Sequence, residues 1–87
     1  MSAYTVTLAG PALDWLARCR DAKLKRRIGE VIDRLGENPR PPGCVKLTGE
    51  VDLWRVRLGD YRILYEIHEG RLHLLVIRIA KRSEAYR

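Results

Sequence analysis

The side chains of this sequence that are best suited to chemistry are arginines in its second half. Arg55 and Arg57 lie two positions apart in an apolar run, and Arg62 follows in the next one. A guanidinium group is planar, always charged and rich in donors, so it makes paired hydrogen bonds to phosphate oxygens. Like charges this close together are costly unless an anion lies among them. The pattern predicts a phosphate-binding group that comprises Arg55, Arg57, Arg62, Arg78, Lys81 and Arg82.

Strand alternation places the first three of these arginines on one face of a sheet. Successive side chains of a β-strand point to opposite faces. In the run LWRVRL at residues 53–58, the apolar positions share one face, which we expect to pack on helices. Arg55 and Arg57 then share the open face. By the same rule, Arg62 points away from the apolar positions of the next strand, which are Tyr61, Ile63, Tyr65 and Ile67.

A structural alternative is that each arginine pairs with a nearby acid. The candidate acids are Asp52, Asp60, Glu66 and Glu84. We favour a phosphate partner because acids are outnumbered, with 17 Lys and Arg against 11 Asp and Glu. Exposed ion pairs also contribute little free energy.

Composition and charge are consistent with a polyanionic partner. The chain has a formal net charge of +6 and a sequence pI near 9.8, which suits nucleic acid, although a basic surface can also serve solubility alone. The two cysteines, Cys19 and Cys44, form no CxxC and have no histidine at metal-ligand spacing. No apolar run approaches the length of a membrane span, and the first residues do not form a signal peptide. We therefore expect a cytoplasmic protein with no membrane partner.

Conventional catalytic sets are absent from the sequence. It has no HExxH motif and no glycine-rich phosphate loop. His68 and His73 flank an expected turn, where solvated side chains are more common than catalytic ones. A site built from Arg, Lys and Tyr can still cleave RNA, because RNA carries its own nucleophile in the 2′-hydroxyl. The protein then has only to orient that group and stabilise the charge on the phosphate.

The elements that must position these residues follow from the apolar periodicity. We expect a strand at 4–8, helices at 11–20 and from 21 to a C-terminal cap at Gly36, and strands at 45–47, 53–58, 61–68 and 72–80. Asp21 is the expected N-cap of the second helix, and the hairpin turns are expected at 59–60 and 69–70. The predicted fold class is α+β, ordered β-α-α-β-β-β-β. It has an antiparallel-dominated sheet with a two-helix hairpin packed on one face, in a single domain over residues 1–87.

Two segments carry a resemblance to a known family. Residues 47–67 read LTGEVDLWRVRLGDYRILYEI, and residues 78–87 read RIAKRSEAYR. With the helical hairpin, the ENPRPPG connection and the KLTG strand start, they closely resemble the RelE/ParE toxin superfamily over nearly the whole chain. The closing KRSxxYR favours the RelE branch, because ParE toxins generally lack the terminal Arg and Tyr.

The resemblance implies a toxin of a type II toxin–antitoxin system with a RelE-like fold. Such a toxin is a ribosome-dependent endoribonuclease that enters the A site and cuts messenger RNA without a metal or other cofactor. The 2′-hydroxyl attacks the adjacent phosphate, which leaves a cyclic phosphate and a 5′-hydroxyl. The implied partners are a RelB-like antitoxin, the ribosome and messenger RNA, with operator DNA reached through the toxin–antitoxin complex.

The family's functional positions fall on residues named above and on two others. The two basic strand positions match Arg55 and Arg57, and the phosphate-binding arginine of GxYR matches Arg62. The arginine that serves the leaving group matches Arg82, and the terminal tyrosine that stacks on or orients the substrate matches Tyr86. We add three expected substrate-binding residues, which are Lys46, Arg78 and Lys81.

One departure from the family concerns the general base. The best-known members have lysines where this chain has Arg55 and Arg57, and arginine is a poor base near neutral pH. Base catalysis then passes to Tyr86 or Lys81, or the site relies mainly on electrostatics. The alternative function is that of a ParE-like toxin, which inhibits DNA gyrase without RNase chemistry.

Overall fold

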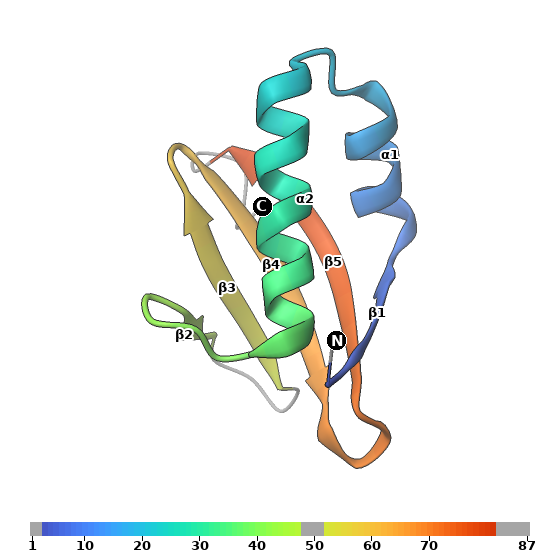
Figure 1. Cartoon of the computed structure of the whole chain (residues 1–87), viewed down its shortest axis with the longest axis vertical. Helices are drawn as coiled ribbons and strands as arrows, with labels where there is room; N and C mark the ends of the chain where they lie inside the picture. The colour runs from blue at the N-terminus through green and yellow to red at the C-terminus, as the bar shows by residue number, and fades with distance from the viewer. Residues whose placement is uncertain (1–2, 48–51, 82–87) are drawn as a thin grey trace.

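The computed structural model of the chain describes residues 3–47 and 52–81. Its elements follow the predicted order (Figure 1). They are β1 (Thr5–Leu8), α1 (Gly10–Arg18), α2 (Ala22–Glu37), β2 (Val45–Lys46), β3 (Leu53–Leu58), β4 (Tyr61–His68), the 3-10 turn η1 (Glu69–Arg71) and β5 (His73–Lys81). None of the helices in these described ranges is long and apolar enough to cross a membrane.

The strands form one sheet in the order β1-β5-β4-β3-β2. Strand β1 runs parallel to β5, and the other neighbours are antiparallel. The two helices lie together on one face of this sheet (Figure 1), which confirms the predicted α+β fold. A parallel pair cannot be joined by a tight turn, and here the long connection between β1 and β5 contains both helices and the strands β2, β3 and β4.

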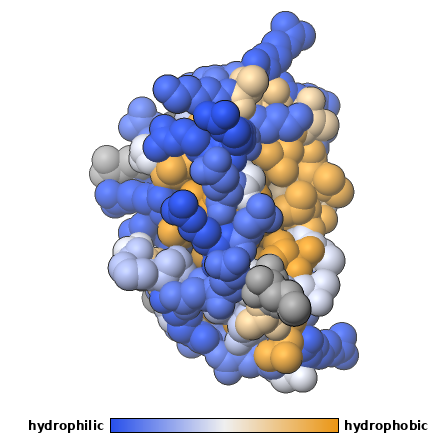
Figure 2. All heavy atoms as spheres, viewed as in Figure 1, coloured by the Kyte–Doolittle hydropathy of each residue, from blue (hydrophilic) through white to orange (hydrophobic). Residues whose placement is uncertain are grey.

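The helices form where the apolar stripe and the capping residues predict them. Pro11 opens α1, where a missing N–H costs nothing, and Asp21 caps α2 by accepting from the Leu24 N–H at 3.1 Å. On the inner side of α2, Ile28 and Leu35 are fully buried. Its outer side is charged, and Figure 2 shows hydrophilic side chains running over this helix.

The core lies between the helices and the sheet. It joins the α2 stripe to inward residues of β4 and β5, two of the interior strands, which are Ile63, Tyr65 and Ile67 of β4 and Leu74, Val76 and Ile79 of β5. The Tyr65 hydroxyl donates to the Pro39 carbonyl at 2.6 Å, so the proline-rich connection is fixed to the core. Burial raises the pKa of Tyr65 well above its ordinary value, and the nearby Cys44 thiol adds to the rise.

The predicted C-terminal ends of both helices differ from the structure. Helix α1 ends at Arg18 rather than near residue 20. Gly36 is not a cap but lies inside α2, whose C-cap is Asn38. The Gly36 carbonyl accepts from the Tyr4 N–H at 2.9 Å, a contact between distant segments that the local sequence does not contain.

The two hairpin turns also differ from each other. Gly59 and Asp60 form the predicted two-residue turn, with Gly59 at φ 58° and with Leu58 directly opposite Tyr61. The second turn is not the predicted pair at 69–70. It contains η1 and then Leu72 in the left-handed region at φ 48°, so β5 begins one residue later, at His73.

Candidate functional site

The predicted arginines of β3 and β4 lie on the face of the sheet that the helices do not cover. Arg57 is directly opposite Arg62 in the β3–β4 pair, and Arg62 is opposite Ala80 of β5. Their strand neighbours Val56 and Ile63 are buried in the core on the other side. Neighbouring strands are about 4.8 Å apart, so the two guanidinium groups start from adjacent backbone positions.

A second row of the same face adds two more arginines. Arg55 is opposite Leu64 of β4, and Leu64 is opposite Arg78 of β5. The rows are two residues apart along the strands, which is about 6.6 Å. Leu64 and Ala80 form a small apolar cluster between them, and Leu47 packs against it. This apolar floor lowers the local dielectric constant, which strengthens the attraction of the surrounding cations for an anion.

A β-bulge decides that Arg78 belongs to this face. Strict alternation from the buried residue Val76 would turn Arg78 toward the helices. The pairing of β4 with β5 shifts between Leu64 and Tyr65, so that Val76 is opposite Tyr65 while Arg78 is opposite Leu64. The extra residue, Ile77, reverses the alternation and sends Ile79 into the core. Bulges often re-aim side chains beside functional sites.

Arg62 is the member of the group that the structure holds most tightly. It is 6% exposed, whereas its cross-strand neighbour Arg57 lies in solvent. A buried guanidinium loses much of its hydration, so it is tolerated only where its surroundings compensate for that loss. A charge kept in a fixed position beside an exposed arginine is suited to hold a phosphate group in one orientation.

Two of the acids that could have neutralised the arginines have other contacts. The Asp52 carboxylate lies near the side chains of Arg40, Lys46 and Trp54. The Glu66 carboxylate is 2.9 Å from the His68 ring. Glu84 lies outside the described residues. The described part of the open face therefore keeps a strong positive bias around its two rows of arginines.

The two predicted lysines do not join the arginines. Lys46 is opposite Trp54, and its ammonium is 3.9 Å from Asp52. Lys81, which we expected on the open face, is opposite Tyr61. Because cross-strand partners point to the same face and both aromatic rings pack toward the helices, both lysines start from the helix side. The predicted residues Arg82 and Tyr86 lie outside the described residues.

The histidines lie at the far end of the open face. His68 and His73 are cross-strand partners with stacked rings, 5.8 Å between centroids. The His73 ring also contacts the Thr7 hydroxyl at 2.6 Å. Along β4, His68 lies six positions from Arg62 and four from Leu64 of the second row, which is about 20 Å and about 13 Å of strand. The histidines are therefore too far from the arginine rows to act on a phosphate bound there.

Arg40 makes contacts beside the sheet that the sequence did not reveal. It comes from the proline-rich connection, forms an ion pair with Glu69 and lies over the Trp54 ring at 5.1 Å. The hydrogen bond with Glu69 raises the pKa of Arg40 above its ordinary value. Trp54 is thus covered on the helix side, whereas its neighbour Arg55 points to the open face because side chains alternate along β3. These partners are distant in the sequence, so no local pattern marks the contact.

Within the described ranges, no three His, Cys, Asp or Glu side chains are grouped closely enough to hold a metal ion. What the arrangement can do is bind the phosphates of a polyanion. Four arginines from three strands meet over a small apolar floor, and their order is set by strand register.

A protein-family model and a curated relative both match this chain. The model, described as the ParE toxin of the type II toxin–antitoxin system parDE, matches residues 6–86. A curated protein from Mycobacterium tuberculosis, named Toxin RelE, is 31% identical over 84 residues, which covers 97% of this chain and 87% of that protein.

Solved structures match at the level of the fold as well. The RelE–RelB complex from Pyrococcus horikoshii contains a chain with a TM-score of 0.79 and 31% identity, and the match covers 95% of this chain and 99% of that one. The isolated RelE toxin from Escherichia coli gives a TM-score of 0.77 at 24% identity, covering 95% and 90%. The latter likeness concerns the fold alone.

Proposed function

Because this chain belongs to the RelE/ParE superfamily of type II toxins and is of the RelE type, we propose that it is a ribosome-dependent endoribonuclease that cuts messenger RNA in the A site. The observation that carries the proposal is the arrangement on the uncovered face of the sheet, where Arg57 is directly opposite Arg62 and where Arg55 and Arg78 flank Leu64 from the two neighbouring strands. An RNA backbone supplies the regularly spaced negative charges that such rows can bind.

The reaction needs an oriented phosphate more than a special nucleophile. The 2′-oxygen attacks the adjacent phosphorus and loses its proton, while the bond to the 5′-oxygen breaks and that oxygen gains a proton. The products are a cyclic phosphate and a 5′-hydroxyl. Arg62 holds the phosphate and, together with Arg55 and Arg57, stabilises the charge that gathers on its oxygens in the transition state. Arg78 binds the neighbouring backbone.

The proton transfers are assigned to residues beyond β5. Arg82 serves the leaving group, and Tyr86 orients the substrate and is the preferred candidate for the general base. Lys81 is the weaker candidate, since its backbone position is opposite Tyr61 on the helix side. An electrostatic mechanism that needs no strong base accommodates arginines at both positions where relatives have lysine.

The test is a translation mixture that contains purified ribosomes and a defined messenger. The purified protein should truncate the messenger at A-site codons, as read by primer extension. Arg82→Ala and Tyr86→Ala should abolish cutting while largely sparing RNA binding. Arg34→Gln is a matched control, because it removes one charge from the last turn of α2, on the helix side. If both site variants cut normally, the assignment of Arg82 and Tyr86 is wrong.

The second candidate function is inhibition of DNA gyrase, which the description of the matching family model as a ParE toxin favours. RelE and ParE toxins share the fold, so only a measurement of activity can distinguish messenger cleavage from gyrase inhibition. If the protein leaves messenger RNA intact in the translation mixture but blocks supercoiling by purified gyrase, the RNase proposal is refuted.

We also infer a cognate RelB-like antitoxin, which the RelE–RelB complexes among the similar structures support. An acidic antitoxin suits a chain with a net charge of +6. Action on translating ribosomes implies a cytoplasmic protein, and operator DNA would be bound by the toxin–antitoxin complex. Copurification of a short acidic protein encoded beside this chain tests the partner.

A further inference from the structure

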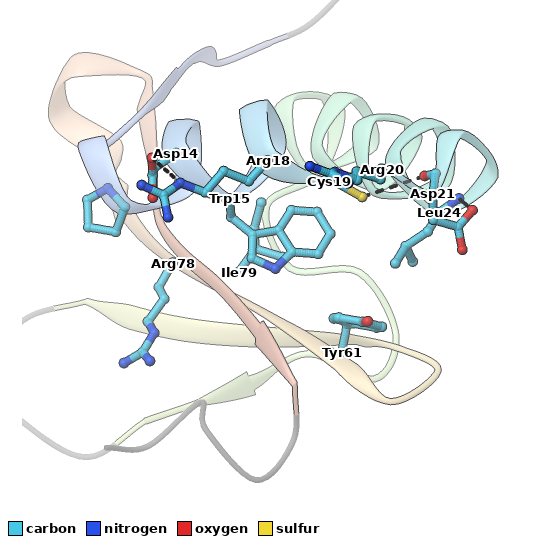
Figure 3. Close-up of a pocket in the computed structure, with 11 residues that line it drawn as sticks. Asp14, Trp15, Arg18, Cys19, Arg20, Asp21, Leu24, Tyr61, Arg78 and Ile79 are labelled. Carbon is cyan, nitrogen blue, oxygen red and sulfur yellow. Dashed lines mark hydrogen bonds and ion pairs between the residues drawn. The ribbon is translucent and has the colours of Figure 1, made fainter.

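A hollow of about 440 Å³ lies where the end of α1 meets the edge of the sheet (Figure 3). Its apolar lining includes Trp15 of α1, Leu24 of α2, Tyr61 of β4 and Ile79 of β5. This volume falls within the range of ordinary small-ligand sites. The hollow is on the helix side of the sheet, whereas the rows of arginines are on the open face.

Two aromatic rings form part of the wall of the hollow. The rings of Trp15 and Tyr61 meet edge to face, with 5.7 Å between centroids and 70° between planes. In Figure 3, the indole reaches from α1 toward the strand that carries Tyr61. Both residues are only partly buried, so part of each aromatic surface is available to a ligand. Aromatic walls of this kind stack well on the flat faces of nucleobases.

The rim of the hollow favours an anionic ligand. Its acids are already engaged, because Asp14 accepts from Arg18 at 3.1 Å and Asp21 caps α2. Arg20 is exposed at the rim and has no ion pair with any residue in the described ranges. A phosphate attached to a bound base would therefore find a cation at the entrance.

The hollow is continuous with the arginine rows through β5. Arg78 lines it, and the same residue is opposite Leu64 on the open face. Figure 3 shows the Arg78 side chain leaving the hollow on the side away from Trp15. Strand β1 pairs with β5 only as far as Val76, and among residues 3–47 and 52–81 no other strand pairs with the edge of β5 beyond that point. A single RNA strand can pass around this edge with its phosphates near Arg78.

From these observations we propose that the hollow is a nucleobase pocket, which receives a base of the messenger that flanks the nucleotides held on the arginine face. The placement of the messenger rests on the proposed function, whereas the binding of a nucleotide does not. A protein segment is the less suitable occupant, because the hollow joins a row of phosphate-binding residues and not a longer apolar groove.

Tryptophan fluorescence can test the pocket directly, since the chain has two tryptophans, Trp15 and Trp54. The probe is a seven-nucleotide RNA with 2′-O-methyl groups, which cannot be cut by 2′-hydroxyl attack. In Trp54→Phe, where Trp15 is the remaining reporter, the RNA should quench the emission and saturate. In the matched variant Trp15→Phe, the emission of Trp54 should not change.

Affinity for the same RNA, labelled and followed by anisotropy, gives a second measure. Trp15→Ala should weaken binding about tenfold, the size expected when one stacked base is lost, and Trp15→Phe should restore most of it. Arg20→Gln should also weaken binding, whereas Arg34→Gln, at the far end of α2, should not. Arg20 is exposed, so its substitution tests the pocket even if Trp15→Ala fails to fold.

Each outcome separates the pocket from the proposed function. RNA binding with no response from Trp15, or no RNA binding at all, overturns the pocket and leaves messenger cleavage to be judged in the translation assay. A response from Trp15 to a Glu- and Leu-containing peptide but not to RNA overturns it in favour of a protein ligand. Quenching by RNA in a protein that never cuts messenger refutes the proposed function and supports the pocket.

Discussion

The two faces of the sheet differ in their side chains, since the helix side is apolar and packed while the open side is rich in arginine. On the helix side, β3 and β4 present Val56, Ile63 and Tyr65, which are buried and packed. On the open side, the same strands present Arg57 directly opposite Arg62. Opposed like charges lower the stability of a strand pair, while packed apolar pairs raise it. The comparison indicates that the helix side supplies the folding free energy and that the open side gives up some of it for binding.

Adjacent residues of one strand show the contrast most sharply. Arg62 and Ile63 are neighbours on β4, both almost fully buried, yet one is charged and the other apolar. A substitution at each position therefore separates loss of binding from loss of packing. The predictions below use such pairs, beginning with the largest expected effect.

Arg62→Gln should lower messenger cleavage about 100-fold to 1,000-fold, the loss typical when one group that stabilises transition-state charge is removed. The measurement is the rate of messenger truncation at saturating ribosomes. The far-UV spectrum and the unfolding midpoint report whether the variant is folded. A folded Arg62→Gln protein that cuts at the normal rate would remove Arg62 from the proposed site.

Ile63→Val should lower the stability of the protein and leave its cleavage activity unchanged. It deletes one buried methylene group from the core and should cost about 1 kcal/mol of unfolding free energy. Cleavage per folded molecule should stay unchanged, because the side chain points away from the arginines. Urea unfolding and the cleavage assay, run on the same preparation, measure both. A loss of activity without a loss of stability would mean that the two faces are not independent.

Tyr65→Phe removes the hydrogen bond to the Pro39 carbonyl and should cost about 1 kcal/mol of stability. It should also change the response to alkaline pH. Burial raises the pKa of Tyr65 in the folded chain, so its contribution is complete below about pH 10, where the unfolded tyrosine titrates, and is lost as pH rises further. Unfolding curves from pH 8 to 11 should show a smaller alkaline loss for the variant. Equal losses would contradict this account of Tyr65.

Lys81→Gln should have the smallest effect, less than about twofold on cleavage, because its backbone position is on the helix side. Tyr86→Phe, in contrast, should lower the rate strongly if its hydroxyl takes the proton. A rate that collapses in Lys81→Gln and survives in Tyr86→Phe would reverse the order of the two candidate bases. The shift of the cleavage pH profile in each variant provides an independent measure.

Most of the fold followed from local patterns. The α2 stripe, the Asp21 cap and the two-residue turn at Gly59 depend on residues within a few positions of one another, and each was predicted correctly. The errors arose where distant segments meet. Gly36 stays helical beside Tyr4, and the turn before His73 is longer than its Glu69–Gly70 pair suggested. A short segment of sequence does not reveal which distant residues will contact it in the folded chain.

In the candidate site, too, local patterns predicted some residues and contacts between distant segments decided others. Alternation alone predicted that Arg55 and Arg57 share a face and that Arg62 avoids the apolar face of its strand, because the period of two is a property of any strand. The sequence also predicted Arg78 and Lys81 in this group, and only the tertiary structure distinguished them, because Arg78 joins the open face and Lys81 does not. That outcome depends on one extra residue, Ile77, in the pairing of β4 with β5. A shift of one residue moves every later side chain of the strand to the opposite face of the sheet. Here the shift accompanies the packing of Ile79 into the core, a contact that no local sequence pattern contains.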